Sequence, residues 1–287
     1  IAAELESHGA EVIYIDEESE IPDNVTAVCT MSRTTSTISR LKDAKKRGIQ
    51  VLNPTAGVEN CSRRRFMEIL RGNAIPQPPF KIVDSSAELS AEYFPCWIKK
   101  AEGWSCHCND VSFAGTKEEA TAAIEEMAQR GANGYIQMLH CPGDIIKFYG
   151  IGEQLFHHSY PTRTKFGKEQ INGSPKHYGF NASRLKEIAQ KAAKAVGIDI
   201  YGGDAIVTPQ GEIFIIDIND FPSFTAIRDL AAKEIATKTS IVEIVIPENL
   251  PENLPEKEQG EDEIVFELNK VMEDVGKIVI QKSEEST

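Results

Sequence analysis

The segment that most constrains the fold runs from residue 202 to residue 224 and reads GGDAIVTPQGEIFIIDINDFPSF. Two short apolar runs, AIV and IFII, flank a Pro-Gln-Gly turn, which predicts a β-hairpin. We expect Asp204 to open the first strand, and Asp217 and Asn219 to close the second. Because side chains alternate along a strand, Asp217 and Asn219 should share one face while Ile218 points to the other.

The three polar residues of this hairpin are of the type that a hard cation prefers. Two carboxylates and an amide supply oxygen donors, which suit Mg²⁺ carrying the phosphates of a nucleotide. The alternative interpretation is a polar hairpin end with caps and turns, because Asp and Asn are common there. The pattern therefore predicts a metal site formed by Asp204, Asp217 and Asn219.

Composition indicates a globular protein and excludes several classes. With 41% apolar and 26% charged residues among 287, the chain can bury one or two good cores. No apolar run approaches membrane-spanning length and nothing resembles a signal peptide, so we expect a cytoplasmic protein without a membrane partner. The chain starts at Ile1 in a helix-like stretch, and we expect missing upstream residues that include a first strand.

The net charge of −13 argues against a nucleic-acid partner. The charge is uneven, because residues 247–287 contain 12 Asp or Glu and 4 Lys, net −8, which leaves −5 for the remainder. The acidity therefore belongs largely to the end of the chain and says little about a substrate.

The cysteines show no disulfide framework of the small secreted kind. The triplet Cys106-His107-Cys108, with His140-Cys141 further on, could suggest zinc. The C-x-C spacing is not a standard finger or ribbon pattern, so buried free thiols are the favoured interpretation. The six cysteines are Cys29, Cys61, Cys96, Cys106, Cys108 and Cys141.

Periodicity and breakers divide the body of the chain into three parts. Strands and helices alternate in residues 1–75, which predicts a small parallel α/β domain followed by a proline-rich linker, AIPQPPF. Residues 76–140 should form a small lobe, with a helix near 86–93 among its strands. Residues 141–246 should form a large lobe that carries the hairpin.

The last part, residues 247–287, is expected to be an acidic linker and appendage. Residues 247–263 repeat a Pro-Glu-Asn-Leu unit and contain few apolar residues, which indicates a solvated linker. Residues 264–281 mix helical and strand-like signals, and either docking on the body or binding a partner would fit them.

Two lysines precede the hairpin inside apolar strands. Lys99 lies in CWIKK (96–100), and Lys147 lies in IIKFYGIG (145–152). A lysine in such a strand is costly to bury unless it is paired, and exposure at a strand edge is the alternative for each. Nucleotide chemistry needs cations against phosphates, so the two lysines ahead of the hairpin favour a nucleotide site.

The order of these parts resembles the ATP-grasp superfamily over roughly residues 1 to 240. The resemblance implies an α/β fold in which an N-terminal pre-ATP-grasp domain precedes two α+β lobes that enclose ATP. The matching features are Asn53-Pro54, the helix start SRRRFMEIL, the linker AIPQPP, the strand PCWIKK, the hinge strand YIQML, the strand DIIKFYGIG and the hairpin.

The resemblance also implies roles for single residues. Lys99 matches the strand lysine that contacts the phosphates, and Lys147 the cation near the transferred phosphoryl group. Arg63 or Arg64 matches the basic residue at the helix start, and Arg33 sits where a substrate-contacting arginine is often found. The remaining matches are the adenine hinge at Gln137, Met138 and Leu139, and the ligands of Mg²⁺, or of Mn²⁺, at Asp204, Asp217 and Asn219.

One loop departs from the pattern of the superfamily. Where members carry a glycine-rich loop over the phosphates, this chain has AEGWSCHCND with the single glycine Gly103. Either His107 or Ser105 donates to phosphate there, or ATP turnover is impaired. His107 and the ending DINDFPSF also resemble the inositol-phosphate kinase branch. The polar loop 162–180, with Arg163 and Lys165, is a candidate acceptor surface or a solvated basic loop.

These observations favour an ATP-dependent ligase that joins a small-molecule carboxylate to an amine. A small-molecule kinase of the inositol-phosphate type would use the same ATP site, although the charge of −5 outside the acidic end disfavours a polyphosphate substrate. A nucleotide-binding protein without turnover is the third hypothesis, because the glycine-rich loop is replaced. A homodimer is compatible with each of them.

Overall fold

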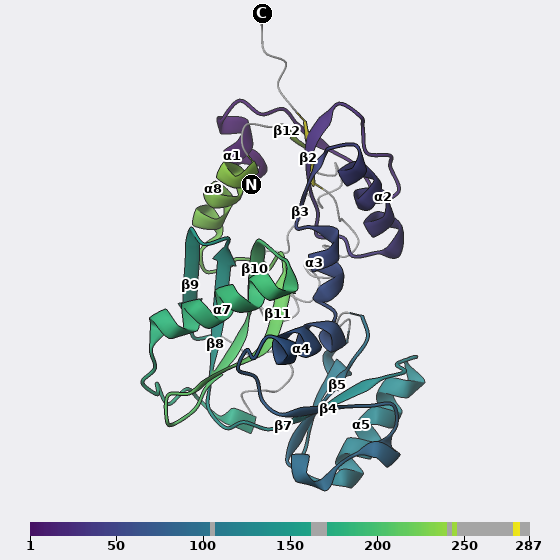
Figure 1. The fold of residues 1–287 in the computed structure, drawn as a ribbon, viewed down its shortest axis with the longest axis vertical. Helices are drawn as coiled ribbons and strands as arrows, with labels where there is room; N and C mark the ends of the chain where they lie inside the picture. Colours follow the sequence, from purple (N-terminus) through teal and green to yellow (C-terminus); the bar gives the residue numbers. More distant parts are fainter. Residues whose placement is uncertain (104–106, 162–170, 240–242, 246–277, 282–287) are drawn as a thin grey trace, which may run out of the picture.

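Three β-sheets follow one another along the long axis of the molecule (Figure 1). The structure, a computed structural model, describes residues 1–103, 107–161, 171–239, 243–245 and 278–281, and the side chains of these except 108, 243–245 and 278–281. Figure 1 shows the N-terminal sheet at the top, the small lobe at the bottom and the large lobe between them. Within the described ranges, no helix is both long and apolar enough to cross a membrane.

The N-terminal sheet has the order β1-β12-β13-β2-β3. Strands β2 and β3 pair in parallel, with Val28 opposite Val51, as the alternating pattern predicted. The helix between them is capped by Thr34, whose side chain accepts a hydrogen bond from the backbone of Thr37. The elements of this part are α1 (Ala2–Ser7), β1 (Val12–Tyr14), β2 (Val25–Cys29), α2 (Thr35–Lys46) and β3 (Gln50–Leu52).

Two strands of the N-terminal sheet come from late in the chain. β12 (Glu243–Val245) pairs in parallel with β1, and β13 (Ile278–Gln281) pairs antiparallel with β1, β2 and β12. Of the two alternatives for residues 264–281, docking on the body therefore holds for 278–281. The predicted solvated linker at 247–263 lies outside the described residues.

The small lobe is an antiparallel sheet with the order β4-β7-β5-β6, covered on one face by α5. Ile124 and Met127 of α5 pack on this sheet in a buried cluster with Val83 and Ile98. Thr116 and Glu119 form a capping box at the start of α5. The elements are β4 (Phe80–Val83), β5 (Cys96–Lys100), β6 (Val111–Ala114), α5 (Lys117–Gln129) and β7 (Tyr135–Leu139).

The helix predicted near 86–93 is wrong. Two short 3-10 turns, η1 (Ser86–Glu88) and η2 (Ala91–Tyr93), stand there instead, separated by Ser90 in an extended conformation. The buried amide of Gln137 accepts from the Ser90 N–H and donates to its C=O, each at 2.9 Å. Because the Ser90 N–H is bound to this side chain and not to a preceding carbonyl, one continuous helix cannot pass through Ser90, whose oxygen also accepts from the Tyr93 N–H of η2 at 3.3 Å.

The large lobe is an antiparallel sheet with the order β11-β10-β8-β9. Helix α7 packs on it through a buried face that includes Leu185, Ile188 and Ala192, and Asn181 caps its first turn. Helix α8 packs against α1 of the N-terminal part. The elements are β8 (Asp144–Ile151), β9 (Leu155–Ser159), α7 (Ala182–Val196), β10 (Ile200–Val207), β11 (Ile213–Asp220) and α8 (Arg228–Thr239).

The predicted hairpin is formed by β10 and β11, but its first strand is longer than expected. Asp204 does not open β10, which begins four residues earlier at Ile200. Gly202 and Gly203 lie inside the strand, at positions where neighbouring atoms leave no room for a side chain. A Cβ at Gly203 would stand 2.2 Å from the backbone oxygen of Asp217. The glycines therefore allow close packing at this point, and they do not mark the end of the strand.

Asparagine side chains join the N-terminal part to the large lobe. Asn53, 1% exposed, donates to the Ile200 oxygen at 2.7 Å and accepts from the N–H groups of Asp199 and Ile200 at 2.9 and 2.7 Å. Asn60, at the end of α3 (Thr55–Asn60), donates to the Val196 oxygen at 2.9 Å. These contacts fix the start of β10 against the N-terminal part.

Helix α4 (Arg63–Gly72) lies between the two lobes (Figure 1). Its buried face, with Phe66, Met67 and Leu70, joins the core cluster that also includes residues of β8, α7, β10 and β11. The linker after α4 is held at Pro76, whose oxygen accepts a 2.9 Å hydrogen bond from Ile215 of β11. Helix α4 thus places the arginines at its start near the hairpin.

Candidate active site

Three charged side chains and a neighbouring amide lie in a row across three adjacent strands of the large lobe. Lys147 of β8 is the register partner of Asp204 on β10, and Asp204 is the register partner of Asp217 on β11. The Lys147 Nζ lies 3.2 Å from the Asp204 Oδ1. Asn219 donates from Nδ2 to the Asp217 Oδ2 at 3.4 Å, so these two side chains share a face as predicted. We call Lys147, Asp204, Asp217 and Asn219 the charged row.

The surroundings of Lys147 favour its ammonium form. The Asp204 carboxylate raises the pKa of Lys147, with a smaller opposing effect from burial. Tyr149, two residues along β8, has its pKa raised by burial, and its ring lies 5.8 Å from that of Phe224. Lys147 is therefore protonated near neutral pH and bears a positive charge in the charged row.

A β-bulge shapes the hairpin beside the charged row. The pairing of β10 with β11 shifts between Asp204 and Ala205, because Asp204 lies opposite Asp217 while Ala205 lies opposite Ile215. Ile216 is therefore the extra residue on β11. A bulge of this kind breaks the ladder locally and redirects backbone groups. Here the oxygen of Ile216 accepts a hydrogen bond from the small lobe.

That hydrogen bond comes from Lys99 of β5. Its Nζ lies 3.1 Å from the Ile216 oxygen, and the side chain is only 5% exposed. The structure therefore brings Lys99 to the strand that carries Asp217. Its neighbour Lys100 takes part through the backbone, because its oxygen accepts from Arg63 Nη1 at 2.8 Å.

The two candidate arginines at the start of α4 point to different places. Arg63 is buried, and burial lowers the pKa of its guanidinium while the charges of Asp217 and Asp110 raise it. Arg64 is partly exposed and forms ion pairs with Glu102 and with Asp84. Arg63 is therefore the buried arginine whose charge acts on Asp217 and Asp110, and Arg64 is held at the surface.

An apolar pocket lies beside Lys99, at the meeting of the two lobes. Its cavity volume is about 20 Å³, room for about one water molecule, so the two lobes are nearly closed on each other here. Met138 of the predicted hinge lines it, whereas the Gln137 side chain points to Ser90 and Leu139 donates its backbone N–H to Pro79. The described lining residues are Pro78, Trp97, Lys99, Val111, Met138, Cys141, Ile145, Asn172, Ile206 and Ile216.

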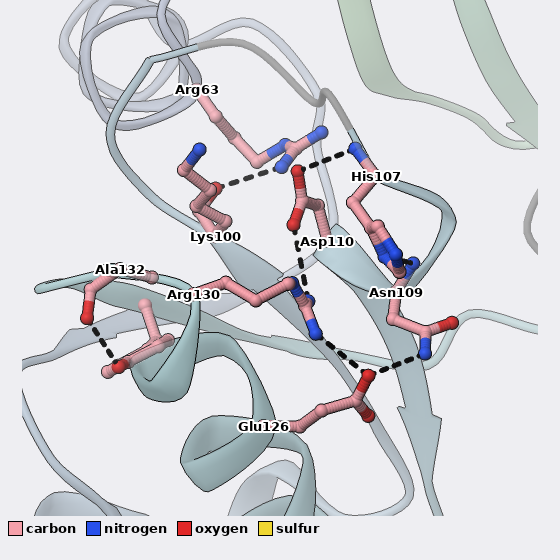
Figure 2. A network of polar contacts seen from close by, with 9 residues as sticks. Arg63, Lys100, His107, Asn109, Asp110, Glu126, Arg130 and Ala132 are labelled. Carbon is pink, nitrogen blue, oxygen red and sulfur yellow. Dashed lines mark hydrogen bonds and ion pairs between the residues drawn. The ribbon is translucent and has the colours of Figure 1, made fainter. Parts of the chain in front are cut away.

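The loop after β5 is organised by side chains, as Figure 2 shows. His107 accepts at Nδ1 from the Asn109 N–H at 3.1 Å, and Asp110 accepts at Oδ2 from the His107 N–H at 3.1 Å. Arg130, which directly follows α5, lies 3.4 Å from Asp110 and 2.8 Å from Glu126, and Asn109 donates to Glu126 at 2.6 Å. These bonds hold the 3-10 turn η3 (Cys108–Asp110) where the superfamily pattern has glycines.

The candidate substrate residues are only partly described. The Arg33 guanidinium lies 2.8 Å from the Asp220 carboxylate and donates to the Asp220 backbone oxygen at 2.9 Å, next to Asn219. A substrate role for Arg33 stays a prediction. The candidates Arg163 and Lys165, with Ser105 of the loop, lie outside the described residues.

Among the described side chains, the predicted metal ligands amount to two carboxylates and one amide, those of Asp204, Asp217 and Asn219. No group of three or more His, Cys, Asp or Glu residues within the described ranges is arranged to hold a metal ion. Cys29, Cys61 and Cys96 are buried free thiols and Cys141 is a partly buried one, in keeping with the free-thiol interpretation. The side chains of Cys106 and Cys108 are not among those described, so the zinc alternative there remains untested.

Sequence reasoning missed two polar residues near the pocket. Asn172 lines it, and its Oδ1 is buried without a hydrogen-bond partner among the described residues. Asp144, at the start of β8, is 4% exposed and accepts hydrogen bonds from the backbone of Lys176 and of Tyr178. An Asn-Gly pair signals a turn and a strand-end Asp signals a cap, so neither pattern indicates a pocket.

The chain is similar to known proteins in structure. No protein-family model and no curated protein sequence matches the chain. A RimK domain ATP-grasp protein from Sphaerobacter thermophilus aligns with a TM-score of 0.64 at 13% identity, covering 82% of this chain and 92% of that one. The D-alanine-D-alanine ligase from Coxiella burnetii aligns with a TM-score of 0.56 at 16% identity, covering 75% and 69%.

A third solved structure is that of the ATP-grasp ligase PsnB, complexed with a precursor peptide and AMPPNP. It aligns with a TM-score of 0.50 at 18% identity, covering 70% of this chain and 65% of that one. At such identities these likenesses establish the arrangement of the backbone. The fold that the motif order predicted is thus confirmed: the chain has the ATP-grasp fold.

Proposed function

We propose that this protein is an ATP-dependent ligase that activates a carboxylate as an acyl phosphate for attack by an amine. The observation that carries the proposal is the charged row beside Lys99 and the apolar pocket. Cations, carboxylates and an apolar slot are the parts that a nucleotide phosphoryl transfer requires. Two of the named structural neighbours are ligases, the D-alanine-D-alanine ligase and PsnB, which supports the same class of reaction.

The apolar lining of the pocket suits the base of ATP, which the pocket would admit once the two lobes separate, and the cationic side chains suit its phosphates. Met138 and Ile216 can pack against a purine ring, and Lys99 leads from this pocket to the strand of Asp217. Arg63 adds a buried positive charge on the same side. PsnB was solved with the ATP analogue AMPPNP, which supports nucleotide binding by a chain of this fold.

The charged row fits a magnesium ion, or a manganese ion, in the chemistry of its donors. Asp204 and Asp217 are carboxylates on paired strands, and Asn219 adds an amide in contact with Asp217. Two carboxylates suit a Mg²⁺ that takes its other ligands from phosphate and water. When bound, the ion would offset the negative charge of the phosphates.

The reaction needs no nucleophilic side chain. An oxygen of the substrate carboxylate forms a bond to the γ-phosphorus while the bond from that phosphorus to the β–γ bridging oxygen breaks, and ADP leaves. The amine then attacks the acyl carbon, inorganic phosphate leaves with the acyl-oxygen bond electrons, and the amine proton passes to solvent. Lys147 and Lys99 hold positive charge where the transferring group becomes more negative.

Two alternatives remain, each favoured by one observation. The sequence DINDFPSF and His107 resemble the inositol-phosphate kinase branch, which would transfer the phosphoryl group to a hydroxyl. The capped turn at His107 replaces the glycine-rich loop, which favours nucleotide binding without turnover. The three functions share the pocket and the charged row and differ in what happens to the γ-phosphate.

The deciding experiment starts with thermal shifts for ATP, ADP and AMPPNP, each with and without Mg²⁺, because a ligand that binds the native state raises the Tm. ADP release is then screened with acids, amines and polyols, with hydroxylamine added to trap an acyl phosphate as a hydroxamate. A hydroxamate supports the ligase, a phosphorylated polyol supports the kinase, and a Tm shift without ADP release supports binding alone. No Tm shift with any nucleotide would overturn all three.

A further inference from the structure

We infer that Asn172 selects the base of the bound nucleotide by accepting a hydrogen bond from the 6-amino group of adenine. The inference rests on the proposed function, because it takes the apolar pocket as the site of the base. It adds a specificity residue that lies on the polar loop, outside both the hinge strand and the charged row.

The position of Asn172 carries the inference. Its side chain lines the pocket together with Trp97, Met138 and Ile216, and its Oδ1 is buried without a hydrogen-bond partner among the described residues. A buried oxygen left without a donor costs about 1 to 3 kcal/mol, so a site that keeps one is built for a ligand that supplies the donor.

The rest of the lining indicates which donor that is. Among the described side chains of the pocket, Lys99 carries only donors, and the indole N–H of Trp97 is bound to the Nδ1 of His140 at 3.1 Å. The thiol of Cys141 is a weak acceptor, so the side-chain carbonyl of Asn172 is the strong acceptor among these side chains. Adenine presents an exocyclic N–H₂ on its edge, whereas guanine and hypoxanthine present an oxygen in the same place. An oxygen facing Oδ1 would be repelled.

A buried carboxylate fixes the segment that carries Asn172. Asp144 is 4% exposed, and its two oxygens accept from the N–H groups of Lys176 at 2.7 Å and Tyr178 at 2.9 Å. Asp144 precedes Ile145, which lines the same pocket. Asp144 therefore ties the chain after Asn172 to the start of β8, and it acts as a positioning residue for Asn172.

The test compares ATP with purine riboside triphosphate, which lacks only the 6-amino group. Kd values are measured by calorimetry with Mg²⁺ for the wild type, Asn172→Ala and the control Asn73→Ala, an exposed asparagine after α4. We expect Asn172→Ala to weaken ATP binding about tenfold and to change binding of the riboside less than about twofold. Asn73→Ala should change neither Kd.

Equal weakening of both nucleotides, or no weakening of either, would overturn the inference while leaving the nucleotide site in place. Failure of the wild-type protein to bind ATP would overturn the proposed function as well. Asp144→Asn tests the positioning role, because it turns an N–H₂ group toward a backbone N–H. We expect Asp144→Asn to weaken binding of ATP more than binding of the riboside triphosphate. In the double variant with Asn172→Ala, it should weaken ATP binding little further. Fully additive losses would overturn the role of Asp144.

Discussion

Lys147 and Lys99 both lie at the candidate site, but they have different partners. Lys147 pairs with the Asp204 carboxylate on the neighbouring strand of its own sheet, and it is 38% exposed. Lys99 is buried, and it donates across the two lobes to the backbone oxygen of Ile216. The ion pair of Lys147 stays in register whatever the small lobe does, whereas the contact of Lys99 depends on the distance between the lobes.

The two lobes are also attached to the rest of the molecule in different ways. The large lobe is bonded to the N-terminal part by Asn53 and Asn60 and by Arg33, which pairs with Asp220. The small lobe joins through α4, a proline-rich linker and apolar packing, in which Trp97 and Met138 share a buried cluster with the large lobe. The charged row therefore lies on strands that are hydrogen-bonded into one framework, whereas the position of Lys99 depends on apolar packing between the lobes.

The largest expected effect is on turnover, through the charged row. Asp217→Asn or Lys147→Met should lower ATP turnover by about 100- to 1,000-fold, because each removes charge from the place where the phosphoryl group is transferred. This loss is measured as the rate of ADP release with the acceptor that gives the highest rate in the screen of acids, amines and polyols. Lys186→Met, which changes an exposed lysine of α7, is the matched control. Turnover within about threefold of wild type in both site variants would show that the site lies elsewhere.

The second-largest expected effect is on the free energy of unfolding, through the hydrogen bonds that attach the large lobe to the N-terminal part. Asn53→Ala leaves the N–H groups of Asp199 and Ile200 without their acceptor and removes one of the two donors to the Ile200 oxygen, which still accepts from the backbone of Phe221. We therefore expect the free energy of unfolding to fall by about 2 to 4 kcal/mol. Asn60→Ala removes one partly buried hydrogen bond, and about 1 kcal/mol is expected. Urea unfolding of both variants checks the order. Equal losses would mean that the framework depends on Asn53 no more than on Asn60.

The prediction for Lys99 separates the two lysines. Lys99→Met keeps the length of a side chain that is almost fully buried and removes its charge, so the free energy of unfolding without ligand should stay unchanged or rise. ATP affinity, in contrast, should fall about tenfold or more, because a phosphate contact is lost. Calorimetry measures the affinity and urea unfolding the stability. A destabilised variant with normal ATP affinity would make Lys99 a structural bridge between the lobes.

The sequence predicted the hairpin and its polar residues well because both depend on local alternation. Asp217 and Asn219 share a face in any regular strand, and the Pro-Gln-Gly turn fixes the hairpin. The bulge at Ile216 was not predictable, since it arises from how β10 and β11 pair. The hinge prediction for Gln137 concerned its backbone, and the sequence did not indicate that its side chain would bind Ser90, which is 47 residues away in the chain.

The sequence did not indicate the contacts between the N-terminal part and the two lobes. Arg63 and Arg64 are equivalent in the motif, and only the packing of α4 buries one and leaves the other at the surface. Asn53 was noted for its motif, whereas its hydrogen bonds to the start of β10 depend on the approach of two parts distant in sequence. Long-range contacts of this kind leave no periodic signal in the chain.

The smallest expected effect is the dependence of stability on pH through Lys147. Its folded-state pKa lies above the usual 10.5 because of Asp204, so the pairing contributes stability that is fully present below the unfolded pKa. This contribution is lost as the pH rises through the folded pKa. The side chain is 38% exposed, so solvent screening keeps the contribution modest and added salt should reduce it.

Urea unfolding of the wild type and Lys147→Met at several pH values checks this prediction. The difference in unfolding free energy between the two should be constant from about pH 7 to about pH 9 and should shrink above the usual lysine pKa. Lys186→Met, with its exposed lysine, should show no such change. A difference that instead grew with rising pH would mean that burial outweighs Asp204 at Lys147. The contrast between a paired lysine on the fixed framework and a buried lysine on the small lobe would then fail.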